Sequence, residues 1–187
     1  ALTVLANFVI VPGLAYGAQL ALAALGVTLV YAVLRFANIA HGDTMAFGTM
    51  ATILATWGLW EAGISLGPLP TALLALPVGI AATAALLLLT DRYVYRFHRR
   101  RRSPPVMFLI LSIGVMFVLN GLVRFVIGTG DQRFFDGERF IILAPRFEAM
   151  TGLDEGLTIK TTQAITVLVA AATVAALFWF LQKTRTG

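Results

Sequence analysis

Three polar side chains, those of Asn38, His41 and Asp43, stand close together in a sequence that is otherwise almost continuously apolar. Histidine and carboxylate groups are the usual ligands of metals and the usual carriers of protons. A zinc site needs three or four protein ligands, and a proton relay needs further ionisable groups within the membrane, where only Arg124 qualifies. The sequence therefore favours neither a metal site nor a proton path, and we expect no cofactor.

A structured break between two helices is the interpretation we favour for the stretch Arg35–Asp43. Polar groups beside hydrocarbon are costly unless they satisfy freed backbone groups. We expect the side chains of Asn38 and Asp43 to accept such hydrogen bonds, with Asp43 capping a helix that begins near Thr44. Gly42 would tolerate a turn, and Arg35 would pair with Asp43 or reach the lipid head groups.

A face of small residues precedes the break. Gly13, Gly17 and Ala21 recur every fourth residue, a spacing that lets two helix backbones approach closely. We expect this face to pack against another helix and so to form a wall of a pathway. The residues predicted to shape that pathway are Gly13, Gly17, Asn38, His41, Gly42 and Asp43.

The elements that must position these residues are membrane-spanning helices. The chain is 59% hydrophobic and only 12% charged, whereas soluble domains are about one-quarter charged. Its uncharged runs reach the roughly 20 residues that a helix needs to cross a bilayer. We predict an all-α, polytopic transmembrane bundle, a single domain over residues 1–187, with a break at Pro12-Gly13. It would have a short apolar segment at 1–11 and about five spans, at 13–34, 39–60, 69–90, 105–127 and 161–182.

Orientation follows from a basic segment. Six arginines lie between Arg92 and Arg102, which marks residues 91–104 as a cytoplasmic loop. Anionic lipids are its simplest partners, and nucleic acid is not expected. Residues 128–160 then form a periplasmic loop, in which Phe140–Leu143 is a short strand or an interfacial segment. Arg35–Asp43 would lie near the cytoplasmic side.

Catalytic motifs are missing from the sequence. It contains no Gly-x-x-x-x-Gly-Lys-Ser/Thr phosphate loop and no cysteine. We therefore expect a transport subunit rather than an enzyme.

Two blocks of sequence resemble a known family. The run Gly13–Tyr31 followed by Asn38–Asp43 is similar to the opening of bacterial permease subunits of branched-chain amino acid ABC transporters. That family has a glycine-rich first helix, then Asn-Phe-Ala-His-Gly and an acid, and Ile39 stands where phenylalanine is usual. Arg102–Pro105 leading into Leu111–Gly114 forms the second block.

The resemblance implies the partners and the location. Such subunits lie in the bacterial inner membrane and pair with a second related permease, two ATPase subunits that hydrolyse the ATP, and a periplasmic substrate-binding protein. In the family, the run that ends at Gly187 leads into a coupling segment and further spans, so we expect the N-terminal two-thirds of a subunit, truncated before the coupling segment. The alternatives are a permease for urea or short amides and an ion-coupled secondary carrier.

Overall fold

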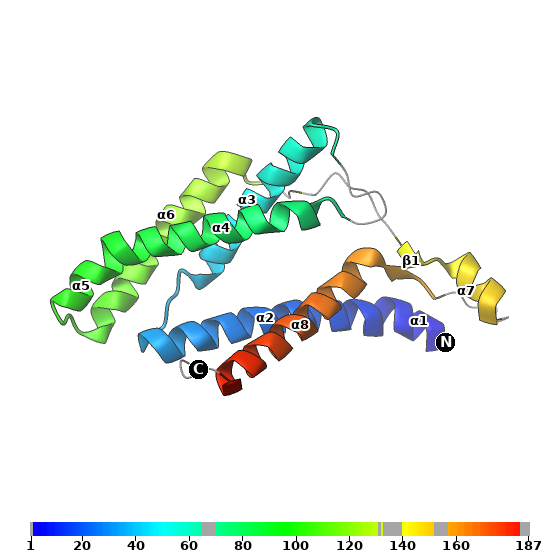
Figure 1. Cartoon of the computed structure of the whole chain (residues 1–187), viewed down its shortest axis with the longest axis horizontal. Coiled ribbons are helices and arrows are strands. Elements are labelled where there is room, and N and C mark those ends of the chain that lie inside the picture. Colours follow the sequence, from blue (N-terminus) through cyan, green and yellow to red (C-terminus); the bar gives the residue numbers. More distant parts are fainter. Residues whose placement is uncertain (1, 65–69, 131, 133–139, 152–156, 184–187) are drawn as a thin grey trace. The chain divides into compact units, whose positions relative to one another are not determined.

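The computed structural model describes residues 2–64, 70–130, 132, 140–151 and 157–183. The contact pattern divides the chain into two compact units, residues 1–26 with 138–187 and residues 27–137. Helix α2 (Val11–Leu34) contributes residues to both units. Figure 1 shows that the described elements are almost all helices, which confirms the predicted all-α fold.

The first unit begins with an unbroken helix rather than the predicted break at Pro12-Gly13. α1 (Leu2–Leu5), the π-helical turn η1 (Ala6–Ile10) and α2 follow one another without a gap. Pro12 cannot donate a helical hydrogen bond, and just before it the Val11 N–H bonds to the Ala6 carbonyl, one residue further back than in an α-helix. This widened turn lets the helix continue through the proline.

The rest of the first unit leads into a second long helix. The strands β1 (Phe140–Ile142) and β2 (Ile159–Lys160) pair antiparallel, which bears out the first of the two alternatives for residues 140–143, a short strand. Between them lies α7 (Ala144–Thr151), and β2 runs directly into α8 (Thr161–Lys183). The Thr158 N–H donates to Asn7 Oδ1 at 2.8 Å, which ties the start of α8 to η1.

The second unit is built around α3 (His41–Glu61). α3 packs against α4 (Ala72–Thr90) and α6 (Pro105–Ile127), as Figure 1 shows. Two glycines set the closeness of the α3–α4 contact. A Cβ on Gly48 would overlap the Thr83 hydroxyl, and a Cβ on Gly79 would overlap the Thr52 hydroxyl. Each threonine bonds back to its own helix, through Thr52 Oγ1 to the Gly48 carbonyl (2.9 Å) and Thr83 Oγ1 to the Gly79 carbonyl (2.7 Å).

Four helical stretches in the described part of the chain are long and apolar enough to cross a membrane. They are Thr3–Leu34, Ala72–Arg100, Pro105–Ile127 and Thr161–Lys183. The helix predicted at residues 39–60 exists as α3, but it is not among these four. Its sequence holds four threonines and three glycines as well as His41 and Asp43. Because α3 buries Thr44, Thr52 and Thr56 against its neighbours, it exposes less of its surface to lipid.

The basic segment is mostly helix, which corrects the loop expected at residues 91–104. After α4 the chain continues as the π-helical turn η2 (Asp91–Tyr95) and then α5 (Arg96–Arg100). Arginine is a good helix former, and an Arg99–Asp91 ion pair spans this extension. The true connection is residues 101–104, which end where Pro105 begins α6.

Candidate functional site: a polar break beside two pockets

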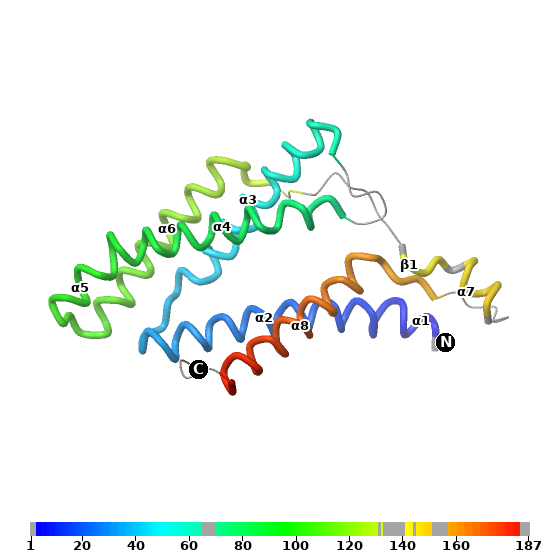
Figure 2. Tube along the Cα trace, viewed as in Figure 1, coloured from blue at the N-terminus to red at the C-terminus, as the bar shows by residue number. Residues whose placement is uncertain are grey.

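The break between α2 and α3 is organised by Asn38. α2 ends at Leu34, Arg35 adopts a left-handed conformation (φ 59°), and α3 begins at His41. Asn38 Oδ1 accepts the Ala40 N–H at 3.2 Å, and the Asn38 carbonyl accepts the His41 N–H at 3.2 Å. Asn38 therefore satisfies freed backbone groups as predicted. Figure 2 traces this short non-helical connection.

Asp43 has a different role from the one predicted. It lies in the first turn of α3 instead of capping it, and the N-cap residue Ala40 makes no side-chain hydrogen bond. Asp43 Oδ1 accepts a hydrogen bond from Asn120 Nδ2 on α6 at 3.0 Å. Both Arg35 and Asp43 are described, and no ion pair joins them. Gly42 lies inside α3 without a positive φ, so it makes no turn.

Residues of the break and of the start of α3 contact α6 along much of its length. The contacts are the Phe36 ring with the Phe108 ring (5.2 Å between centroids), the Ile39 N–H with Ser112 Oγ (3.2 Å), and Asp43 with Asn120. Phe108 and Asn120 are twelve residues apart, which is about 18 Å of helix. The break therefore runs lengthwise beside α6 instead of crossing it.

This path places Asp43 well along α6, far from the Pro105 end of that helix. Asn120 lies about 22 Å from the Pro105 end of α6 and about 10 Å from the Ile127 end. Phe36 and Asp43 therefore contact α6 at different levels along its length. That Arg35–Asp43 lies near the cytoplasmic side stays a prediction. Polar groups beside a helix that is long and apolar enough to cross a membrane are functional candidates by default.

An aromatic cluster holds the end of the break that follows α2. Phe36 is buried and lies 5.6 Å from the Tyr95 ring, and Tyr95 lies 6.5 Å from Phe108. The Tyr95 hydroxyl donates to Asn38 Oδ1 over a long 3.5 Å. The basic helical extension thus contacts the break directly through Tyr95.

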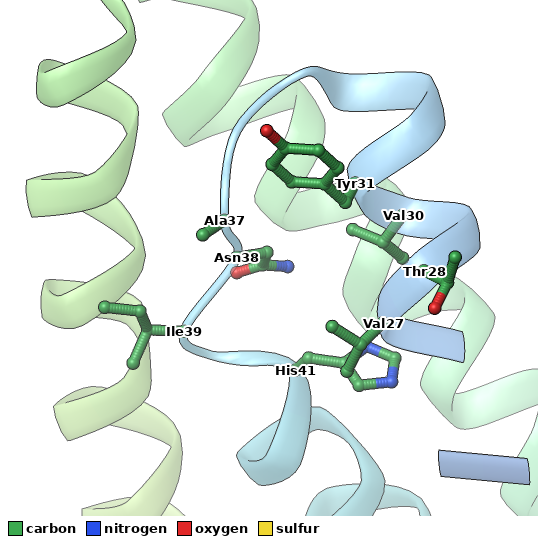
Figure 3. A pocket seen from close by; sticks show the side chains of 8 residues that line it. All are labelled: Val27, Thr28, Val30, Tyr31, Ala37, Asn38, Ile39 and His41. Carbon is green, nitrogen blue, oxygen red and sulfur yellow. The ribbon is translucent and has the colours of Figure 1, made fainter. Parts of the chain in front are cut away.

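Two pockets lie on either side of Asn38. The first, of about 290 Å³, is formed by the last turns of α2, with Thr28 and Tyr31, and by the break, with Asn38 and His41. Figure 3 shows Asn38 turned toward Tyr31 and Val30, whereas Ile39 points the other way. This volume is close to the lower end of small-molecule sites, at about 300 Å³.

The second pocket is larger and almost entirely apolar in character. It has a volume of about 460 Å³ and reaches from Asn38 and Thr44 to Leu87, Leu88 and Tyr95 at the end of α4. Asn38 is thus the polar group that lines both pockets. The arrangement can offer a hydrogen bond to a polar ligand group while apolar walls receive an apolar one.

The predicted pathway residues fall into two sets. Asn38, His41, Gly42 and Asp43 come together at the break, whereas Gly13 and Gly17 belong to the first unit. A Cβ on Gly13 or Gly17 would meet no atom within 4 Å. The close helix approach that we expected there is found instead between Gly48 and Gly79. Among the residues that the structure describes, no three His, Asp or Glu side chains gather in a metal-binding group.

Ser112, Tyr95 and Asn120 were missed as members of this site. Ser112 is fully buried (0% exposed), and its Oγ both accepts from Ile39 and donates to the Leu109 carbonyl at 2.8 Å. Its place in the second resemblance block was the one available signal. Asn120 is the only amide side chain between Pro105 and Ile127, and this isolation could have marked it.

Fold and site together define a membrane protein with a polar break between two helices. The chain matches, over residues 9–187, the family described as "Branched-chain amino acid transport system / permease component", and it belongs to that family. Relatives include proteins named "High-affinity branched-chain amino acid transport system permease protein LivH" from Escherichia coli K12 and from Salmonella typhimurium LT2. Each is 28% identical over 183 residues, which cover 94% of this chain and 54% of the relative. The chain therefore spans about half the length of these curated relatives. No solved structure matches it significantly.

Proposed function

We propose that this chain is the membrane-spanning part of a permease subunit in an ATP-driven importer of branched-chain or similar amino acids. The observation that carries the proposal is the family match over residues 9–187. The structure supports it with a polar break between two helices, where Asn38 lines two small pockets. A branched aliphatic side chain suits walls of valine, alanine and leucine, and Asn38 suits a polar group.

The break is suited to alternating access. It is held by a few hydrogen bonds from Ser112, Asn120 and Tyr95 rather than by a continuous helical ladder. Small shifts of α6 or of the basic extension would therefore move Asn38 relative to both pockets. In this proposal Asn38, His41, Gly42 and Asp43 shape the pathway at the break, and Gly13 and Gly17 shape it along α2.

The partners and the location follow from the same proposal. The subunit would lie in the bacterial inner membrane with a second permease, two ATPase subunits that hydrolyse ATP, and a periplasmic binding protein. The basic residues 91–104 would face the cytoplasm, where they meet anionic lipid, and residues 128–160 would face the periplasm. The chain itself would perform no hydrolysis.

Uptake of labelled leucine by the complete transporter in proteoliposomes tests the proposal. We expect uptake to require ATP and the binding protein, and to be competed by unlabelled leucine or valine but not by urea. Competition by urea would identify a permease for short amides. Uptake that collapses with the proton gradient while ATP persists would identify an ion-coupled carrier.

Variants of the break test the pathway residues separately. We expect Asn38→Ala and His41→Ala to lower the leucine uptake rate at unchanged membrane abundance. Gly58→Ala is the control, because it lies on α3 with no atom within 4 Å of a new Cβ. Unchanged uptake in both break variants would remove Asn38 and His41 from the pathway without contradicting the transport function.

A further inference from the structure

The basic end of the α4 extension contains a third hollow, which shares Leu88 and Asp91 with the second Asn38 pocket but adds three arginines. It has a volume of about 550 Å³ and is lined by Leu88, Asp91, Arg92, Arg96 and Arg99. Arg92, Arg96 and Arg99 are spaced four and three residues apart, which places them on one face of the helix. The hollow therefore gathers three guanidinium groups and one carboxylate.

The charges in this hollow are unevenly paired. Arg99 forms an ion pair with Asp91, and both side chains are about half exposed (48% and 46%). Within the described part of the chain, neither Arg92 nor Arg96 takes part in an ion pair. Because Asp91 neutralises one of the three arginines, the side chains that line the hollow carry a net charge of +2. The hollow therefore suits an anion.

The shape of arginine and the neighbouring surface indicate which anion. A guanidinium presents a planar fork of donors that fits phosphate oxygens. Leu88, which lines the same hollow, is 72% exposed. The neighbouring Leu87 and Leu89 at the end of α4 are also exposed. A phosphate that carries acyl chains would use both surfaces, whereas a free phosphate would use only the arginines.

We propose that Arg92 and Arg96 form a specific binding site for the phosphate of an anionic phospholipid, with its acyl chain lying against Leu88. Basic pockets at the membrane boundary are suited to such head groups. The site is distinct from general attraction of the arginine-rich segment to a charged surface, because Arg100 and Arg101 lie outside the hollow. The site rests on the membrane placement given in the proposed function, but lipid binding can be measured without transport.

Binding of lipid to the purified chain tests the site. The chain is placed in nanodiscs of phosphatidylcholine with increasing phosphatidylglycerol, and bound phosphatidylglycerol is counted by native mass spectrometry. We expect wild type to enrich phosphatidylglycerol over phosphatidylcholine, and the double variant Arg92→Gln/Arg96→Gln to bind it about tenfold more weakly. Glutamine and arginine have similar helix propensity, and unchanged circular dichroism would show that the fold is intact.

The matched control removes the same charge from the same segment. Arg100→Gln/Arg101→Gln should change phosphatidylglycerol binding by less than about threefold, because only long-range attraction is lost. An equal loss in both double variants would overturn the specific site. Asp91→Asn should instead strengthen binding, since it frees Arg99 and removes the one negative charge in the hollow.

Inorganic phosphate separates the two sources of the anion. We expect millimolar phosphate to leave phosphatidylglycerol binding unchanged, because it lacks the contact with Leu88. Displacement of the lipid by phosphate would reassign the hollow to a free anion. Equal binding of phosphatidylglycerol and phosphatidylcholine by wild type would overturn the lipid proposal and point to an acidic protein surface as the occupant.

Discussion

Gly79 of α4 lies directly against the Thr52 hydroxyl of α3, with no room for a side chain between them. The Gly48 carbonyl also lies 3.0 Å from the position that a Gly79 Cβ would take. Backbone on one side and a fixed hydroxyl on the other leave little scope for adjustment. The close approach of α3 to α4 at this point therefore depends on Gly79 having no side chain.

Gly79→Ala should therefore destabilise the protein by about 1–3 kcal/mol, the usual range for overpacking. Thermal unfolding of the purified chain in detergent measures the effect. Gly114→Ala on α6 is the control, because a Cβ there meets nothing within 4 Å, and it should be neutral or stabilising by up to about 1 kcal/mol. Addition of Thr52→Ala should recover part of the loss in Gly79→Ala, and a purely additive pair would contradict the overlap.

Asp43 and Asn120 should be energetically coupled. Their 3.0 Å hydrogen bond joins α3 to α6, and hydrogen bonds between membrane helices contribute about 0.6–2 kcal/mol. A double-mutant cycle with Asp43→Ala and Asn120→Ala, read by unfolding in detergent, should give a coupling energy in that range. Asn120→Ala combined with Thr166→Ala on α8 should be additive, since Thr166 Oγ1 donates to the Thr162 carbonyl of its own helix. Additivity of the Asp43 pair would show that the contact carries no stability.

The long helices were predictable from the sequence because each contains a long run without charged residues, whereas the short α5 and α7 were not predicted. The bounds of α6 match the predicted 105–127, and α2, α4 and α8 begin or end within three residues of expectation. Pro12-Gly13 misled the prediction because proline and glycine mark a break only where the backbone cannot adapt. The π-helical turn η1 supplies that adaptation.

Only those contacts of the candidate site that join residues close in the sequence could be predicted. Asn38 could be identified because the backbone N–H that it binds, that of Ala40, lies only two residues further along the chain. Ser112 and Asn120 lie more than 70 residues from the groups they bind, and one sequence does not say which helix faces meet. The small-residue pattern was noticed at Gly13 and Gly17, yet the close contact is at Gly48 and Gly79, because spacing alone does not identify a partner helix.

Ser112→Ala should lower the free energy of unfolding although it removes only one oxygen atom. The substitution removes one hydroxyl at a fully buried position and takes away the partner of the Ile39 N–H, whose own residue is 43% exposed. Loss of such a hydrogen bond should cost about 0.5–1.5 kcal/mol. Thr173→Ala, which removes an exposed hydroxyl bonded within α8, should stay within about 0.5 kcal/mol. Equal unfolding temperatures for Ser112→Ala and wild type would mean that the Ile39 N–H finds another acceptor.

Asn38→Ala should loosen the break without unfolding the helices around it. The side chain provides the acceptor for the Ala40 N–H, while the Ile39 N–H keeps its bond to Ser112. Local opening depends on such isolated bonds and is reported by amide hydrogen exchange. We therefore expect exchange at Ala40 to accelerate at least about tenfold in Asn38→Ala, with amides in the middle of α6 unchanged. Asn38→Asp keeps the oxygen acceptor and should retain most of the protection at Ala40. Equal acceleration in the alanine and aspartate variants would show that the amide group, and not its oxygen, holds the break together.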